Sequence, residues 1–533
     1  QGGKGIFRGD RGGAGRSRVS NPGRGDAATD DPLARSLCHR PWPPPHPTVQ
    51  DLRRHPRRWR RTIDLGVLVG DVEAACCRAG LALPGPDPLD QVATLALLAE
   101  RAAGAIAVRE RLHRDHPWVG DAPFLSASGS LAEQVVLEER RRDAQREPVR
   151  AVRDLPVADL LGRPERFRAR RADVRAAMAG ILDGRVGWSE RGHLDLRPAG
   201  SWTFTVGGVD LGLGVGGLHS ADAPGMIEGP ISDLDVASYY PGIIASDHIA
   251  PAGFAAFPDR VRVVMEGRLA AKRSGDTVAA NALKIVVNSL YGQLGNHRSA
   301  LFAPAGALRV VLTGQLRLLQ LIDGILEAGG DLLSANTDGI LVRGGTEATT
   351  AWQAETGLTL ERSDYRRLWR TSINDYVALA ADGSIKTKGR FGGGDDDESI
   401  TRRAAAPIIA RAAVERLVHH RPIAETVAAS DRCTDFTLWR RANGLHWGDE
   451  PITTRVARWI AARDGQPLIQ ITRERHRTTV AAKAILVPDP NTIALAAIDR
   501  DWYINEAQNL VDRVLGTDGG AKQLRFLDES DGR

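Results

Sequence analysis

Two strand-like segments, far apart in the chain, each bring an aspartate to a turn, and this pairing limits the fold more than any other feature. The first, ISDLDVASYYPGII (231–244), is apolar up to Asp235 and then enters a Pro-Gly turn. The second, DLLSANTDGILVRG (331–344), has two apolar runs that meet at Asp338-Gly339, a dipeptide that predicts a tight hairpin. Either aspartate alone could simply end a strand. Together they supply the two carboxylates of a site for hard cations such as Mg²⁺.

Between these segments, RLAAKRSGDTVAANALKIVVNSLYG (268–292) predicts two helices around a Ser-Gly turn. Helical spacing puts polar side chains on one face of each helix: Arg268 and Lys272 on the first, and Lys284, Asn288 and Tyr291 on the second. Only seven of the 71 basic residues are lysines, and two of them fall in this short span. Converging cations of this kind suit a nucleotide triphosphate, whereas the alternative is a helix with solvated basic residues.

A second Asp-Gly hairpin is predicted in DGSIKTKGRF (382–391), where Lys386 and Lys388 follow the turn. These lysines could hold a nucleic-acid backbone, and a solvated strand edge is the alternative. The glycine-rich segment 201–220 reads as strands without a dinucleotide-binding turn, so its His219 is interpreted as a structural loop residue.

The length of 533 residues predicts two to four domains, and a sequence pI of about 9.1 favours nucleic acid as a partner. The four cysteines, Cys38, Cys76, Cys77 and Cys433, have neither metal-ligand spacing nor a disulfide pattern. No run of 18 apolar residues and no signal peptide is evident, so no membrane partner is expected and the cytoplasm of a bacterial host cell is the expected location.

Along the chain, residues 1–30 read as a disordered or non-native start, which suggests a fragment. Residues 31–204 read as mostly helical and include a basic run at 53–61 with one tryptophan, suited to phosphate contacts or to a solvated face. A glycine-rich and acidic break at 389–400 predicts a domain boundary. Helical periodicity returns in 402–420 and 501–515.

Taken together, these motifs resemble those of family B DNA polymerases. DVASYYP is similar to motif A, KIVVNSLYG to motif B and NTDG to motif C, in the family's order and spacing, and KTKGRF resembles its KxY-type motif. The resemblance covers roughly 205–515. It implies an α+β right-hand polymerase with an antiparallel-sheet palm (205–256 and 300–395), short two-helix fingers (257–299), a helical thumb (400–533) and a mostly helical N-terminal region (31–204) that forms an incomplete exonuclease or N-terminal domain.

The resemblance also implies roles for individual residues. Asp235 and Asp338 would be the catalytic, metal-binding carboxylates, with the Val236 carbonyl as a further ligand. The nucleotide-binding residues would be Tyr240, under the sugar and against a 2′-hydroxyl, Arg268, Lys272 and Lys284 on the triphosphate, and Asn288 and Tyr291 at the nascent base pair. Lys386 or Lys388 would contact the primer strand, and the choice between them stays open.

Three departures from the family pattern carry consequences. Asn336 and Gly339 stand where motif C usually has Asp and Ser, so we expect a weaker negative charge with metal binding and activity retained. The short interval from Asp235 to Lys284 disfavours a protein-primed enzyme. Asp71-Val72-Glu73 resembles an exonuclease motif, but the first tyrosine is Tyr239, so a YxxxD motif cannot precede the palm and a complete exonuclease site is not expected.

The sequence therefore predicts a DNA-directed DNA polymerase of phage or mobile-element type, with primer-template DNA and deoxynucleotides as partners and two Mg²⁺ ions, or Mn²⁺, as cofactors. The alternative from another class is a catalytically degenerate remnant that binds nucleic acid. A reverse transcriptase or RNA polymerase fits the motif B pattern and Tyr240 less well.

Overall fold

The computed structural model describes residues 72–516, with gaps at 80, 84–87, 120–125, 127, 138–153, 189–193, 198–201, 393–405 and 473–474. All of these residues belong to one compact unit, Pro43–Arg533. The predicted start segment 1–30, the basic run 53–61, Asp71 and the acidic residues 393–400 lie outside the described residues.

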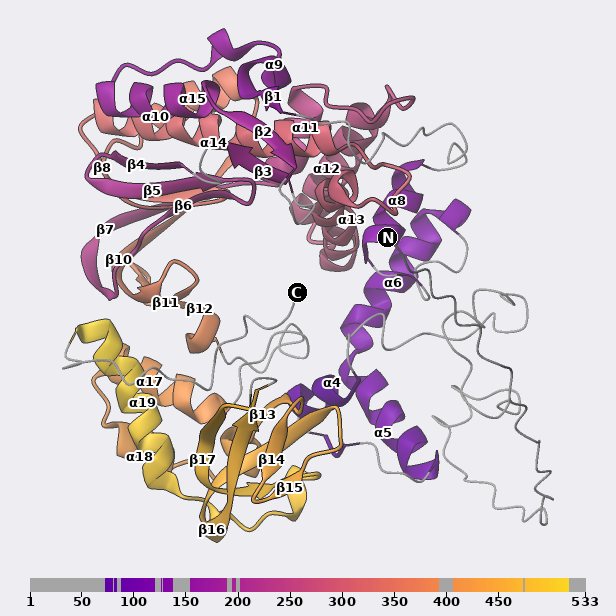
Figure 1. Cartoon of the computed structure of the whole chain (residues 1–533), viewed down its shortest axis with the longest axis vertical. Helices are drawn as coiled ribbons and strands as arrows, with labels where there is room; N and C mark the ends of the chain where they lie inside the picture. The colour runs from indigo at the N-terminus through magenta and orange to yellow at the C-terminus, as the bar shows by residue number, and fades with distance from the viewer. Residues whose placement is uncertain are drawn as a thin grey trace, which may run out of the picture. The chain divides into compact units, whose positions relative to one another are not determined.

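The largest sheet of this unit, within the described residues, is a six-stranded antiparallel one (Figure 1). In sheet order its strands are β12 (Ile385–Lys388), β11 (Asp375–Ala380), β10 (Leu360–Ser372), β7 (Gly225–Val236), β9 (Gly339–Arg343) and β8 (Asp331–Asn336). Both predicted Asp-Gly hairpins are confirmed, because β8 pairs with β9 and β11 with β12. The register sets Asp235 opposite Gly339 on one side and opposite Glu361 on the other. Segments distant in sequence therefore meet around the end of β7.

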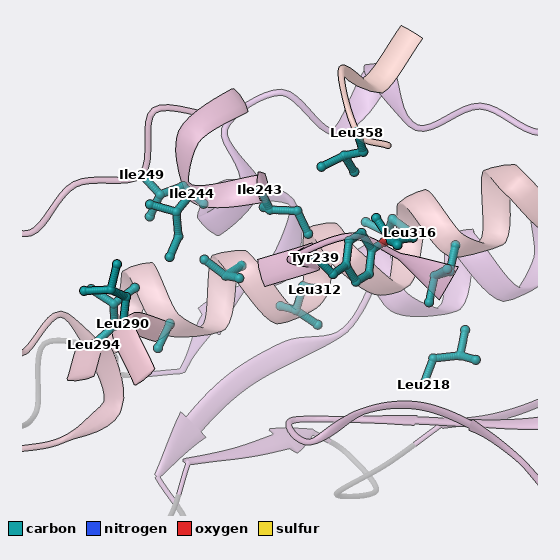
Figure 2. Packing of buried hydrophobic residues seen from close by; sticks show 14 of the residues in the cluster. Leu218, Tyr239, Ile243, Ile244, Ile249, Leu290, Leu294, Leu312, Leu316 and Leu358 are labelled. Atoms are coloured by element: carbon teal, nitrogen blue, oxygen red, sulfur yellow. The ribbon is translucent and has the colours of Figure 1, made fainter. Parts of the chain in front are cut away.

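The helix α14 (Pro304–Glu327) packs against β8 and β9 of this sheet, and α11 (Tyr239–Ser246) and α15 (Ala348–Thr356) pack against α14. By length and composition alone α14 could cross a membrane, and the bent pair α5–α6 passes the same test when taken as one span. However, 78% of the most apolar window of α14 is buried. Figure 2 shows its Leu312 and Leu316 in the core with Tyr239 and Ile243 of α11. α14 is thus the central helix of the core.

A second, three-stranded sheet extends the surface beyond β8. It consists of β4 (Trp202–Val206), β5 (Val209–Gly214) and β6 (Gly217–Ser220). The first of these strands packs on α10 (Ala172–Leu182). A Cβ on Gly180 would lie 2.3 Å from the Phe204 ring, so this glycine permits the close approach of helix and strand. The strand-like reading of 201–220 is confirmed.

The two helices predicted around the Ser-Gly turn are α12 (Phe257–Arg273) and α13 (Thr277–Gly295). Asp276 caps α13 by accepting a hydrogen bond from the Ala279 N–H (2.9 Å), as expected at a helix N-terminus. Upstream helices brace this pair: α6 (Ala103–Asp115) donates a hydrogen bond from Arg111 to Asp276 (2.6 Å), and α8 (Ser128–Leu137) accepts one at Glu133 from Ser299 (2.7 Å).

The rest of the region upstream of β4 is mostly helical, as predicted, with three short strands added. Its remaining elements are α4 (Val72–Ala79), α5 (Pro88–Arg101), η2 (Pro117–Val119), β1 (Leu155–Pro156), α9 (Val157–Leu161), η4 (Pro164–Arg166), β2 (Arg185–Trp188) and β3 (Leu194–Arg197). Glu73, from the DVE triplet, accepts a hydrogen bond from the Val456 N–H (3.2 Å). This acid therefore helps α4 pack on the C-terminal sheet.

The expectation of a helical segment from residue 400 onward is wrong in part. Helices α17 (Pro407–His419), α18 (Ile423–Ala428) and α19 (Arg500–Leu515) are present, but they pack against a five-stranded antiparallel sheet. Its strands are β13 (Leu438–Arg441), β14 (Leu445–Trp447), β15 (Glu450–Pro451), β16 (Val456–Ile471) and β17 (Arg477–Leu486). Short 3₁₀ turns are η5 (Gly389–Phe391), η6 (Cys433–Phe436), η7 (Pro490–Thr492) and η8 (Leu495–Ala497). The first half of β16 is buried on both faces, so it lacks the alternation that reveals a half-buried strand.

Candidate active site

Two aspartates meet where β7 ends beside the β8–β9 turn. Asp235 is the residue before last of β7, and Asp338 lies in the turn, where its carbonyl oxygen accepts a hydrogen bond from the Val236 N–H (2.7 Å). A Cβ on Gly339 would lie 2.8 Å from the Leu234 carbonyl oxygen and 3.2 Å from the Asp235 carboxylate. Glycine in place of the usual motif C serine thus keeps the two strands close.

Both carboxylates reach solvent at the surface, yet the surrounding protein and their mutual repulsion make ionisation unfavourable. Partial desolvation, followed by the charges of Asp338 and Asp233, raises the pKa of Asp235 from 3.8 to about 7. Desolvation also raises the pKa of Asp338, against the opposing charge of Lys388. Within the described part of the chain, neither carboxylate forms an ion pair with a basic side chain. Among the described residues, Lys386 and Lys388 therefore offset the charges of Asp235 and Asp338 only in part and from a distance.

Asn336 takes part in the turn through its side chain. Its Oδ1 accepts a hydrogen bond from the N–H of the next residue, Thr337 (2.8 Å). Asn336, at the first position of motif C, therefore stabilises the backbone of the turn that contains Asp338. Among the described residues, no group of three or more His, Cys, Asp or Glu side chains is arranged to hold a metal ion.

Motif A continues from Asp235 into α11, and its two tyrosines have different surroundings. The Tyr239 hydroxyl is buried and donates to the Gly314 carbonyl (2.5 Å), which fixes α11 on α14. The Tyr240 ring lies 4.4 Å, centroid to centroid, from Tyr291 of α13. The structure thus brings together two residues that the sequence predicts at the nucleotide.

The cations of α12 point toward motif A and the sheet. Arg268 donates to the Ser238 hydroxyl (2.7 Å), and Lys272 donates to Glu361 (2.9 Å), which lies directly across from Asp235. Two of the three predicted triphosphate ligands are thus placed beside the carboxylate pair. The third, Lys284, is half-buried on α13, and Asn288 is exposed one turn later. Within the described part of the chain, no contact given for either residue involves Asp235 or Asp338.

The two lysines of β12 approach the same place from the far edge of the sheet. Lys386 donates to Asp233 (3.2 Å) and lies 5.8 Å from the centre of the Tyr365 ring. Partial burial alone would lower the pKa of Lys386, but Asp233 and Tyr365 outweigh it and raise the pKa. Lys388 lies 5.9 Å from the centre of the Tyr376 ring and also acts electrostatically on Asp338. Both lysines border the site, so the choice between them as a primer contact stays a prediction.

Sequence reasoning missed two acids of this site. Asp233 lies two positions before Asp235, and strand alternation places both side chains on one face, so this signal was available in the sequence. Glu361 reaches the site only through the β7–β10 register, which no local pattern reveals. His219, interpreted as a structural loop residue, lies on β6 with its Nε2 3.4 Å from the Thr337 hydroxyl.

The site thus combines a carboxylate at the end of β7, a second one in the β8–β9 turn, and an arginine and a lysine from α12. Paired carboxylates of this kind can hold divalent metal ions. The chain is 28% identical over 199 residues to DNA polymerase II of Escherichia coli (strain K12), an alignment that covers 32% of this chain and 25% of that enzyme. The aligned part thus spans about a quarter of the relative's length. The predicted resemblance to family B DNA polymerases, to which that enzyme belongs, is thereby confirmed in sequence.

Among solved structures, the family B DNA polymerase from the hyperthermophilic archaeon Pyrobaculum calidifontis matches with a TM-score of 0.44 at 15% identity. That match covers 82% of this chain and 58% of the archaeal chain. No protein-family model matches the chain.

Proposed function

We propose that this chain is a DNA-directed DNA polymerase, which adds deoxynucleotides to a primer 3′-hydroxyl by metal-dependent nucleotidyl transfer. The observation that carries the proposal is the meeting of Asp235 and Asp338 at the β7 and β8–β9 turn, next to Arg268 and Lys272. Likeness in sequence to a DNA polymerase supports the same reading.

The donor set fits Mg²⁺. This ion prefers oxygen ligands and is commonly held by one or two carboxylates, with substrate phosphates and water completing its shell. Asp235 and Asp338 supply the carboxylates, and the Val236 carbonyl is a candidate third ligand. The pKa is raised at both aspartates, as expected for carboxylates whose ionised form a bound cation would stabilise. When bound, two such ions would activate the attacking primer oxygen and stabilise the charge on the leaving pyrophosphate oxygen.

The other predicted residues then have separate tasks. Arg268, Lys272 and Lys284 would bind the triphosphate, and Lys386 or Lys388 the primer backbone. Tyr240 would lie under the sugar and exclude a 2′-hydroxyl, while Asn288 and Tyr291 would border the new base pair. In this assignment the six-stranded sheet is the palm, α12 and α13 are the fingers, and the mixed C-terminal region is the thumb.

Primer extension by the purified full chain tests the proposal. We expect extension with Mg²⁺ and deoxynucleotides, and a loss of about 10³-fold or more in Asp235→Ala and Asp338→Ala, as expected when several kcal/mol of charge stabilisation are removed. Asp331→Ala is the matched control, because Asp331 is exposed at the other end of the β8–β9 hairpin. Binding of primer-template without extension by the natural chain would contradict the proposal and indicate the degenerate remnant instead.

A further inference from the structure

The β5–β6 hairpin is fixed by a buried polar network to β8, the strand that leads into the turn with Asp338. Ser220 accepts a hydrogen bond from the Ala335 N–H (2.9 Å) and donates one to Asp222 (2.6 Å). Asp222, whose side chain is 3% exposed, also accepts from Ser334 (2.6 Å) and Arg370 (2.8 Å). Buried networks that are fully hydrogen-bonded favour a single arrangement. The hairpin therefore has a defined position beside β8.

At the tip of this hairpin, Gly217 touches both motif A and motif C. A Cβ on Gly217 would lie 3.1 Å from two side-chain atoms of Thr337 and 3.3 Å from the Tyr240 hydroxyl oxygen. Such distances are closer than ordinary van der Waals contact, so a neighbour would have to move. The φ angle of Gly217 is +126°, which side chains also disfavour. Glycine thus allows the hairpin to close against Tyr240.

Tyr240 is held on three sides. Its ring stacks on Tyr239 with the centroids 5.9 Å apart, lies tilted against Tyr291 at 4.4 Å, and has its hydroxyl beside the hairpin tip. Leu218, next to Gly217, is buried in the same core as Tyr239 and Leu316 (Figure 2). Because the flanking rings and the hairpin are anchored in this core, the hydroxyl end of Tyr240 keeps its position only while residue 217 has no side chain.

We propose that the β5–β6 hairpin is a wall of the nucleotide pocket, and that Gly217 is a specificity-determining residue because it fixes the Tyr240 ring against the incoming sugar. This inference rests on the proposed function. A side chain at Gly217 would displace the Tyr240 ring. A deoxynucleotide would then lose its contact with the ring and bind more weakly, whereas the affinity for a ribonucleotide, which is already low, would change little.

Deoxynucleotide binding to the full chain on a primer-template with a dideoxy-terminated primer tests this without catalysis. We expect Gly217→Ala to weaken deoxynucleotide binding about tenfold and to lower the ratio of deoxynucleotide to ribonucleotide affinity by a similar factor. Gly208→Ala is the matched control, because Gly208 also has a positive φ (+81°) but has nothing within 4 Å of its Cβ position. It should bind both nucleotides as the natural chain does.

A double-mutant cycle identifies the contact that matters. Tyr240→Phe removes the hydroxyl that the new Cβ would meet, so adding Gly217→Ala to it should weaken binding by only about threefold or less. If Gly217→Ala does not fold, recovery of folding in the double variant supports the inference, and failure of both overturns it. Equal behaviour of Gly217→Ala and Gly208→Ala also overturns it.

The outcomes separate the two claims. If the natural chain binds deoxynucleotide and Gly217→Ala lowers the nucleotide ratio as expected, but the natural chain never extends a primer, the proposed function fails and the role of Gly217 in nucleotide binding stands. If it extends primers but Gly217→Ala keeps the natural nucleotide ratio, the role of Gly217 fails and the proposed function stands. A natural chain that does neither contradicts both.

Discussion

Asp247, at the C-terminal end of α11, neutralises a cluster of arginines in the core, and its loss should strongly destabilise the fold. Its side chain is 1% exposed and accepts hydrogen bonds from Arg166 and from Arg317, whose side chain is 9% exposed. Burial lowers the pKa of Arg317, and the charge of Asp247 opposes that effect. Arg309 has the same two influences on its pKa. Asp247 therefore pairs with two arginines, and its charge also acts on a third, Arg309.

Asp247→Asn keeps the shape of the side chain but removes this charge. Breaking a buried ion pair from one side destabilises a protein by about 3–5 kcal/mol, because an uncompensated charge stays buried. Because the compact unit spans Pro43–Arg533, a change of 1 kcal/mol shifts the melting temperature by about 1 °C, so the melting temperature should fall by roughly 3–5 °C. Thermal melts followed by circular dichroism at neutral pH measure this.

The control variant removes an acid from an exposed ion pair, and comparison with it gives the result that would refute the argument. Asp259 forms an ion pair with Arg262 (2.8 Å) in which the side chains are 64% and 43% exposed, so Asp259→Asn should destabilise by less than about 1 kcal/mol. Adding Arg317→Met to Asp247→Asn should recover part of the loss, since one of the stranded cations is removed. If Asp247→Asn melts within error of Asp259→Asn, the compensation argument is wrong.

Three further predictions concern the site. With the pKa of Asp235 raised to about 7, extension at limiting Mg²⁺ should fall about tenfold per pH unit below 7. Metal-free stability should instead fall as pH rises from about 4 to 7, because the folded pKa of Asp235 exceeds the unfolded one; in melts with a chelator, Asp235→Asn should reduce that fall and leave the part due to Asp338. Asn336→Asp should lower the half-saturating Mg²⁺ concentration about threefold in titrated extension assays, while a rise from undetectable to robust activity would show that the natural chain is degenerate. Lys272→Ala should raise the KM for deoxynucleotide about tenfold, and Glu361→Gln should lower this KM because it frees Lys272 from its ion pair. Steady-state kinetics in which the KM rises in both variants would contradict a role of Lys272 in triphosphate binding.

The local features of the site could be predicted from the sequence because they depend on neighbours in the chain. The Asp338-Gly339 turn follows from its flanking apolar runs, and the α12–α13 pair follows from helical spacing around Ser274-Gly275. Motif residues such as Tyr240 and Tyr291 come together as the resemblance implies. Each of these depends on a period or a dipeptide that a single segment displays.

What failed were features that depend on pairing between distant segments. β16 reads ambiguously because burial on both faces hides its alternation, so the sheet after residue 437 was mistaken for helix. Glu361 becomes an active-site neighbour only because β10 pairs with β7 in one register. A shift of one residue would turn that acid to the opposite face.

Gly217 illustrates the same limit and what it means for function. In the sequence it is one glycine in a segment rich in them, and nothing local distinguishes it from Gly208 or Gly212. In the fold it is the one of these three whose missing side chain leaves room for Tyr240. In the proposed function the carboxylates carry out the reaction. The choice of sugar, as we propose it, depends on the space between Gly217 and Tyr240, which lie more than twenty residues apart in the chain. Substitutions at such positions should change nucleotide selection while leaving every recognised motif intact.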